Sequence, residues 1–567
     1  MQQVSEAWTN NQKAIVRDPG FVVVETPGLK ISCGTVSYSK EIQTSFEPQD
    51  DGTVIAIAQQ VLTSDPVGCE HIAKCVVRLK CRTTEFYPFT VSTLDHESNV
   101  ISTIKVNSAT ELDSNAEYSW QTSGFYRVKV TVLGMVIPTV TQISLDVYGI
   151  PASSIKALEH TRSYDPMGFE LPTNNVSIDL YNIGDMYTEL YRGYNGEKHS
   201  IVVSYGYRLT SGDEVIRGGK FTLTDMQLSD DGILTLTGES QLAFVDDKAT
   251  LDLFDLKADE DNCISVVVNP ESVTSGSTSV DLSSRAELQI TVSDLVAALS
   301  REAAVAISCS DEYANTALNG VAINSDYISI CQELTSFLLC KSYIDRQDVL
   351  HYDYRTTTSV ESGADILQSN SLDEPAYASA KSVRKFEIEA TSYENTATAT
   401  KTDSVEPEEY NSRMYIDLDT VSNKLKSCSM QNVYCLYKLE LYKTYVRAYY
   451  RARANRAPTI NVVYAPPEPL TENIQVTSSG AICDIENSLG KPTNTTKIAN
   501  YFNNRDLYTF NLRGNPARDV GDYINVSLSN DADTTTYKKG LLLSSTLTYD
   551  GSFKEECTVR IINTEFE

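Results

Sequence analysis

Between residues 140 and 247 the chain consists of short runs in which apolar and polar side chains alternate, separated by residues that favour turns. The runs are QISLDVYG, NVSIDLYN, HSIVVSYGYRL, GGKFTLTDMQL and GILTLTGES, and the turn segments include TSGDE and SDDG. A period of two places successive side chains on opposite faces of a strand. Strands of this length and spacing favour an antiparallel barrel or sandwich.

The composition extends this interpretation to the whole chain. The 567 residues include 33 tyrosines, and together with abundant Thr, Ser and Val these favour pleated, half-buried surfaces. A chain of this length is expected to form roughly three to five domains. We therefore expect a mainly β protein with minor α, built from several antiparallel barrel or sandwich domains with short helices.

A few segments carry helical spacing. We expect helices at residues 4–14, from an N-cap at Ser293, at 328–338, and in TNTTKIANYFNNR. The segment LYKLELYKTYVRAYYRARANR is compatible with one helix or with two strands. It holds the main local concentration of basic residues, namely Arg447, Arg451, Arg453 and Arg456.

The formal charge of −29 argues against a nucleic-acid-binding surface, because neutralising phosphates requires clustered Lys and Arg. The N-terminus MQQVSEAWTNNQKAIV has no basic region followed by an apolar one, so no secretory signal is predicted. No window approaches the roughly 18–20 apolar residues of a membrane-spanning helix. We expect a protein made and kept in the cytoplasm until assembly.

Two local clusters are candidate metal sites. CEHIAKCVVRLKC brings Cys69, His71, Cys75 and Cys81 together in sequence, but a strand over CVVRLKC would separate its ends, whereas zinc needs convergent ligands. The acidic run at 246–262 lacks the central glycine and final glutamate of a calcium loop. Packed thiols and a solvated charged face are the favoured readings, so no metal or cofactor is predicted.

No catalytic constellation emerges from the sequence. The five histidines, at 71, 96, 160, 199 and 351, stand singly. The sequence contains no zinc-protease, nucleophile-elbow, phosphate-loop or dinucleotide-binding motif. We therefore predict a protein that is not an enzyme.

Two further features are candidates for a binding or structural role. Trp120, in YSWQTSGFYRV, could stack on a sugar ring, although a core or edge tryptophan is the commoner case. In RGNPARDVGDYINV, Gly514, Pro516, Gly521 and Asp522 predict the turn that opens a strand, because proline lacks an amide donor and glycine reaches unusual backbone angles.

Several segments resemble, in serial order, parts of tail proteins of tailed bacteriophages and prophages of Gram-positive hosts. They are VSEAWTNNQKAIVRDPGFVVVE, FELPTNNVSIDLYNIGDMY, VIRGGKFTLTDMQLSDDGILTLTGES and NGVAINSDYISICQELTSFLLCKSYIDRQDVLHY. A fifth, NSLGKPTNTTKIANYFNNRDLYTFNLRGNPARDVGDYINVSL, is similar to the C-terminal element of a tail hub. Together these segments touch most of the chain.

The resemblance implies a tail-tip or baseplate hub in the virion, assembled in the host cytoplasm. Such hubs are typically homotrimers whose paired barrels match a hexameric tube. The implied partners are the distal tail or tube protein, the tape-measure protein and a receptor-binding protein, with DNA passing through the channel without specific binding. The alternatives are a baseplate adhesin that binds host cell-wall saccharide and, less favoured because the chain stops soon after the hub element, a tail-associated peptidoglycan hydrolase.

The resemblance and the strand pattern together predict six segments. They are a first hub segment (1–67 with 134–150), an inserted carbohydrate-binding-like β-sandwich (68–133), an antiparallel barrel (151–250), a mixed α/β domain (251–355), a mixed β/α region with exposed loops (356–470), and a C-terminal helix with a barrel (471–567).

Overall fold

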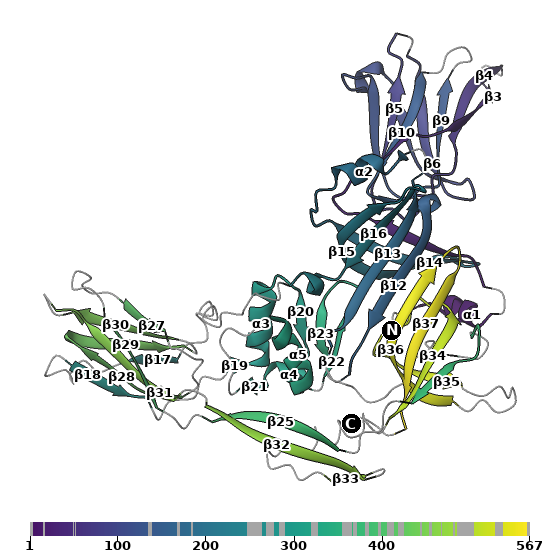
Figure 1. Ribbon diagram of the computed structural model, residues 1–567. Coiled ribbons are helices and arrows are strands. Elements are labelled where there is room, and N and C mark those ends of the chain that lie inside the picture. The colour runs from purple at the N-terminus through teal and green to yellow at the C-terminus, as the bar shows by residue number, and fades with distance from the viewer. Residues whose placement is uncertain are drawn as a thin grey trace.

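The structure, a computed structural model, is mainly β, with several antiparallel sheets and a few short helices (Figure 1). This confirms the predicted class. Within the described residues no sheet closes on itself, so the predicted barrels are not confirmed. The described residues are 4–14, 17–48, 50, 53–84, 86–133, 139–166, 170–182, 185–245, 264–267, 277–282, 290–318, 327–338, 340–353, 366, 371–379, 385–394, 398–404, 413–417, 424–442, 445–452, 456–465, 468–479, 482–484, 504–527 and 537–563.

A 12-stranded sheet, here called the large sheet, contains strands from both ends of the chain. Its order is β11-β1-β14-β15-β16-β13-β12-β36-β37-β34-β24, with β35 paired to β36. The central join is the antiparallel pair β12 and β36, in which His160 lies opposite Leu547. The strands are β1 (Gly20–Glu25), β11 (Gly149–Ile150), β12 (Ile155–Ser163), β13 (Thr173–Tyr181), β14 (Ser200–Leu209), β15 (Gly212–Leu228), β16 (Ile233–Glu239), β24 (Ala376–Ser379), β34 (Asp506–Arg513), β35 (Tyr523–Ser527), β36 (Tyr537–Tyr549) and β37 (Phe553–Ile561).

Two further sheets form an N-terminal two-sheet unit, and side chains from both enter one core cluster. One sheet has the order β2-β10-β5-β8 and the other β3-β4-β9-β6-β7. Strands from outside residues 68–133 therefore pair with strands inside that range, while the predicted division into six segments stays a prediction. The bounds are β2 (Ile31–Thr35), β3 (Tyr38–Pro48), β4 (Val54–Ser64), β5 (Cys75–Cys81), β6 (Phe89–Leu94), β7 (Val100–Val106), β8 (Glu117–Thr122), β9 (Arg127–Leu133) and β10 (Val140–Val147).

Helices gather mainly in an α/β unit beside the large sheet (Figure 1). It comprises β19 (Ile290–Thr291), α3 (Val292–Glu302), β20 (Ile307–Cys309), α4 (Asp311–Ala314), β21 (Ala317–Leu318), α5 (Tyr327–Leu338), β22 (Lys341–Ile344) and β23 (Leu350–Asp353). The helix predicted at 328–338 is confirmed as α5, and the helix predicted at 4–14 is confirmed as α1 (Glu6–Lys13). The helix predicted in TNTTKIANYFNNR lies almost wholly outside the described residues.

The prediction that Ser293 caps α3 is wrong. The N-cap is Thr291, whose side chain accepts a hydrogen bond from the backbone amide of Asp294, while the Asp294 carboxylate accepts one from the amide of Thr291. This reciprocal pair satisfies two amides of the first turn. Ser293 consequently lies inside that turn.

A distal two-sheet unit surrounds a separate core cluster and lies beyond a two-stranded antiparallel ribbon, away from the large sheet (Figure 1). The ambiguous segment near residue 440 forms two of its strands, β29 and β30. One sheet contains β17 (Ile264–Val267), β29 (Val433–Leu441), β30 (Tyr445–Ala452) and β27 (Arg413–Asp417). The other contains β18 (Ser277–Asp281), β28 (Lys424–Gln431), β31 (Thr459–Ala465) and β26 (Ala399–Ser404). The two-stranded ribbon is the antiparallel pair of β25 (Lys385–Glu394) with β32 (Glu468–Ser479), and β32 also pairs with β33 (Ile482–Asp484).

The pairing of β1 with β14 provides a test of packing in the large sheet. Phe21 lies opposite Gly206, and a Cβ added at Gly206 would come within 2.3 Å of the Phe21 ring, which also stacks on His71. Gly206→Ala should therefore lower the free energy of unfolding by about 1–3 kcal/mol, as overpacking does. The measurement is the urea midpoint of the purified chain.

Gly193→Ala is the matched control, because nothing lies within 4 Å of a Cβ added there, at the end of α2 (Thr188–Gly193). It should change the free energy of unfolding by less than about 0.5 kcal/mol. Equal midpoints for the two variants would contradict the proposed clash.

Candidate functional site

Residues 514–522 form an irregular loop, here called the junction loop, between β34 and β35. It contains Gly514, Pro516, Gly521 and Asp522, the residues predicted to form a turn before a strand. The amide of Gly514 donates to the carbonyl of Phe553 at 2.9 Å, and the amide of Gly521 donates to that of Leu542 at 2.7 Å. Gly521 has φ +81, and a Cβ there would lie 2.6 Å from Lys341. The positive backbone angle favours glycine, whereas the close approach is to the flexible end of Lys341, which could shift.

The first buried charge pair of the junction loop joins it to β37. Arg518 Nη1 lies 2.5 Å from Glu555 Oε2, and the two side chains are 1% and 0% exposed. Glu555 also accepts hydrogen bonds from the Asn515 amide at 3.2 Å and from the Ser545 hydroxyl at 2.9 Å. Additional donors of this kind offset the cost of removing the carboxylate from water.

The second charge cluster joins the junction loop to two other parts of the chain. Asp519 Oδ1 lies 2.7 Å from Arg162 Nη1, on β12, and 2.8 Å from Arg346 Nη2, in the turn between β22 and β23. Arg346 also donates to the carbonyls of Arg217 at 2.5 Å and Pro516 at 2.9 Å. The Arg346 guanidinium, which belongs to the α/β unit, therefore contacts both β15 and the junction loop. Burial alone would raise the pKa of Asp519, but the two guanidinium groups outweigh it and hold that pKa well below its usual range.

Two more carboxylates complete the contact between the α/β unit and the large sheet. Asp522 lies 3.8 Å from Lys341 Nζ; its burial raises its pKa, and Lys341 opposes that shift. Asp348 accepts from the Gln241 amide at 3.1 Å through each of its oxygens. Burial raises the pKa of Asp348 to about 6, and the Gln241 amide only partly counters it. The arrangement is a largely buried ionic junction whose groups contact one another and the backbone.

Four of the histidines lie beside a carboxylate, and the fifth is buried among neutral groups. His71, His96 and His351 face Asp213 at 3.2 Å, Glu70 at 3.3 Å and Asp345 at 3.1 Å, and His199 lies 3.9 Å from Glu197. His160 is buried between the Tyr205 hydroxyl at 2.8 Å and the Asn174 side chain at 2.7 Å. Burial lowers its pKa to about 3. None of these contacts includes a serine or cysteine side chain.

Of the four candidate zinc ligands, Cys69 and Cys75 lie in contact, and this contact together with burial raises the pKa of the Cys69 thiol, whereas Cys81 lies at the other end of β5. Cys75 and Cys81 begin and end β5, as the strand reading predicted, and Cys69 is a buried free thiol. His71 stacks on Phe21 with ring centroids 4.8 Å apart and faces Asp213. Over the described ranges, no group of three or more His, Cys, Asp or Glu side chains is arranged to hold a metal. The acidic run at 246–262 lies outside the described residues.

Trp120 lies on β8, the edge strand of its sheet, opposite Val77. Its side chain is partly buried and packs against the core of the N-terminal two-sheet unit. Its role in saccharide contact stays a prediction.

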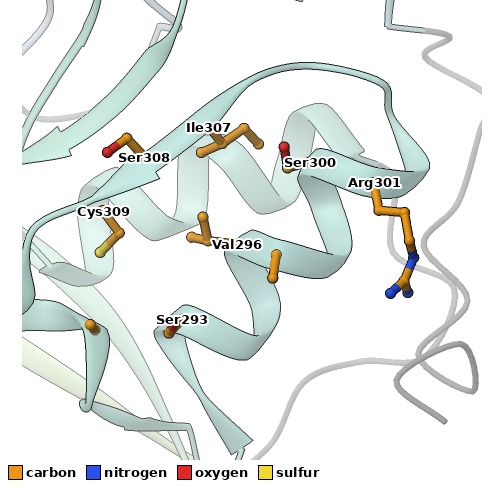
Figure 2. A pocket seen from close by; sticks show the side chains of 9 residues that line it. Ser293, Val296, Ser300, Arg301, Ile307, Ser308 and Cys309 are labelled. Carbon is orange, nitrogen blue, oxygen red and sulfur yellow. The ribbon is translucent and has the colours of Figure 1, made fainter. Parts of the chain in front are cut away.

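A shallow pocket of about 520 Å³ lies between α3 and β20 (Figure 2). Val296 and Ile307 supply apolar lining, and Ser300 donates to the carbonyl of Val305 at 2.7 Å. Burial raises the pKa of Cys309 to about 11, so this thiol is protonated at neutral pH. The pocket therefore presents no activated nucleophile at that position.

Among the helices of the described chain, none is long and apolar enough to cross a membrane.

Sequence reasoning found the junction loop but missed the charged residues that bind it, namely Arg162, Arg346, Arg518 and Glu555. One signal was present for Glu555. In β37 it occupies the buried phase of an alternating strand, between exposed Lys554 and Glu556. An acid at an apolar position predicts a buried partner. Arg162 and Arg346 carried no comparable signal.

Comparison with known proteins gave matches among solved structures alone. No family model matches the sequence, and no curated protein matches it. The tail protein from Neisseria meningitidis MC58 aligns with 8% identity and a TM-score of 0.32, covering 72% of this chain and 92% of its own. The prophage tail protein gp18 from Listeria monocytogenes EGD-e aligns with 9% identity and a TM-score of 0.33, covering 84% of this chain and 95% of its own.

The Arg518–Glu555 pair yields a stability test. Glu555→Gln removes the counter-charge of a fully buried guanidinium and should lower the free energy of unfolding by about 3–5 kcal/mol. The measurement is urea unfolding followed by far-ultraviolet circular dichroism. Lys554→Gln, at the exposed neighbouring position paired with Asp550, should cost less than about 1 kcal/mol. If both variants unfold at the same urea concentration, the buried pair does not hold the loop.

Asp348 yields a pH test. Because its folded-state pKa is raised, the ionised carboxylate carries a cost that is fully present above about pH 6 and is relieved as pH falls toward 4. Asp348→Asn keeps an acceptor for the Gln241 amide and tolerates the φ of 68 at this position. At pH 7.5 the variant should be more stable by about 1–2 kcal/mol, after allowance for solvent screening.

The measurement for Asp348→Asn is thermal unfolding at intervals between pH 4 and pH 8. The advantage of the variant should shrink below pH 6 and vanish near pH 4. A constant difference across the range would contradict ionisation of Asp348 as the cause.

Proposed function

We propose that this chain is a structural protein of a phage tail, placed at the tail tip or baseplate hub, where it closes or extends the tail tube and connects it to host-recognition parts. The observation that carries the proposal is the serial order of hub-like sequence segments along the chain. The first of them contributes β1 and the last contributes β34 and β35, and all three strands belong to the large sheet. Segments at opposite ends of the sequence therefore contribute strands to one sheet.

The ionic junction supports a mechanical role. The junction loop connects β12, β37 and the α/β unit through Arg162, Arg518, Arg346 and their carboxylate partners. A component that transmits load between neighbours needs its own parts fixed in position. Breaking a buried ion pair costs more than breaking an exposed one. The ion pairs of the junction loop are therefore suited to keeping these parts of the chain fixed relative to one another.

The proposed assembly is a homotrimer that contacts the distal tail or tube protein, the tape-measure protein and a receptor-binding protein. The large sheet ends at β24, whose four residues are exposed, with Tyr377 at 56%. An exposed edge strand can add a strand from another chain. This edge is therefore a natural contact between copies.

The charge of −29 suits a channel through which DNA passes, because carboxylates facing the bore would reduce adhesion of phosphates. A trimer whose bore is basic and whose acids face outward would contradict this part of the proposal.

The saccharide-binding adhesin and the peptidoglycan hydrolase remain the alternatives. The half-buried position of Trp120 does not favour the former, and a zymogram of the purified protein should show no lysis.

The assembly prediction is tested on the purified chain. Mass photometry should show a species of about three times 62.7 kDa, with dissociation on dilution. A monomer at every concentration would contradict the homotrimer. Gold-labelled antibody on intact particles should mark the tail tip, and labelling along the tail shaft or on the head would contradict the hub location.

A further inference from the structure

Strand β29 presents two exposed tyrosines on the distal two-sheet unit. Tyr434 is 57% exposed and Tyr437 is 45% exposed. They occupy equivalent places in the repeated triplets Val433-Tyr434-Cys435 and Leu436-Tyr437-Lys438. In each triplet the first residue is buried, and its tyrosine is exposed. The strand therefore follows a period of three over this stretch instead of the usual two.

Two β-bulges produce this period. In the pairing of β29 with β30, the register shifts between Val433 and Cys435 and again between Leu436 and Lys438. Each tyrosine is the extra residue of its bulge, so each bulge adds one side chain to the outward face. Bulges redirect side chains and interrupt the ladder of hydrogen bonds. Two of them in one nine-residue strand enlarge a single face with aromatic rings.

A hydrogen-bond network centred on Glu440 holds the neighbouring side chains in place. Its carboxylate lies 2.5 Å from Lys438 Nζ and 3.1 Å from Arg447 Nη1, and it accepts from the Tyr449 hydroxyl at 2.9 Å. The Tyr449 ring lies 6.2 Å from that of Tyr437 and 5.2 Å from Lys438 Nζ. Because these groups are already oriented, a ligand would pay little to order them.

The charge of this face is opposite to that of the chain. Strands β29 and β30 carry Lys438, Arg447 and Arg451 against one acid, Glu440; Arg447 is buried beside Glu440, so Lys438 and Arg451 are the cations that the two strands present to solvent. The whole chain has 47 basic and 76 acidic residues. Arg451 is exposed and lies opposite Cys435, beside the first bulge. An anion is therefore attracted to this face more than to the average surface.

We propose that the tyrosine-bulge face, made of Tyr434, Tyr437, Lys438, Tyr449 and Arg451, binds an acidic polysaccharide. Tyrosine rings offer apolar faces on which sugar rings stack, and their hydroxyls can bond sugar hydroxyls. Lys438 and Arg451 provide donors for a carboxylate on the sugar.

The chemistry of the face favours a saccharide over a protein partner. Protein interfaces generally have an apolar centre surrounded by a polar rim. Here the leucines of β29 point into the core, and Val267 on β17, opposite Lys438, is the aliphatic residue with large exposure beside the tyrosines. Figure 1 shows the unit at the end of the two-stranded ribbon formed by β25 and β32, away from the large sheet. Tyr434 and Tyr437 are exposed there, and binding by this face does not depend on the proposed place in a tail.

The test uses the full purified chain and electrophoresis in gels containing polygalacturonate, with dextran as the neutral polysaccharide. The wild type should be retarded by polygalacturonate and much less by dextran. The double variant Tyr434→Ser/Tyr437→Ser should weaken retardation at least tenfold, and Arg451→Gln should weaken it severalfold. The control Tyr181→Ser/Tyr537→Ser removes tyrosines that are 43% and 48% exposed on the large sheet, away from the β24 edge, and should bind like the wild type.

Several results would overturn the proposal. They are absence of retardation of the wild type, unchanged binding by the Tyr434→Ser/Tyr437→Ser variant, and tighter binding of single-stranded oligothymidylate than of polygalacturonate. Loss of self-association in the variant, measured by sedimentation velocity, would instead assign the face to a contact between copies. Equal melting temperatures of the wild type and the Tyr434→Ser/Tyr437→Ser variant would show that the variant is folded. The mass photometry and antibody labelling experiments test the proposed tail function, and their failure would leave the result of the gel experiment unchanged.

Discussion

Asp519 holds the molecule together at the point where three parts of the chain meet. Its carboxylate receives guanidinium groups from Arg162 on β12 and from Arg346 in the α/β unit. Neither arginine could be buried at low cost without that anion. The carbonyls of Arg217 and Pro516 occupy further donors of Arg346. The orientation of the α/β unit on the large sheet therefore depends on one short loop being correctly shaped, which explains why a glycine with φ +81 at position 521 is favoured there.

Local pattern predicted much of the fold but little of the ionic junction. Alternation of side chains correctly indicated β13, β14, β15 and β16 of the large sheet and β10 of the N-terminal two-sheet unit, and apolar spacing correctly indicated α1 and α5. The cap of α3 was displaced by two residues because Thr291 and Asp294 form a reciprocal pair that competes with Ser293. Partners such as Arg162 and Asp519 are separated by 357 positions. No local pattern reports a contact of that separation, so the junction could not be derived from the sequence.

The segment near residue 440 shows why period alone was ambiguous. Apolar residues at Val433, Leu436 and Leu439 are three apart, a spacing that also suits one side of a helix. In the structure the same spacing arises from a strand with two bulges. The physical difference lies in tyrosine and β-branched content, which favours pleated structure. A repeated triplet with an aromatic second residue is thus compatible with a strand that shows more of its side chains to solvent than a regular one.

The join between β12 and β36 has a consequence for synthesis of the chain. Leu158 pairs with Tyr549, so the ribosome must make nearly 400 intervening residues before the edge of β12 finds its partner. The N-terminal two-sheet unit draws all its strands from residues 31–147, and it can complete its pairing early. The growing chain then carries an open sheet edge, which is prone to pairing with other chains. Rapid release of the finished polypeptide, or a helper that shields this edge, would limit aggregation during production.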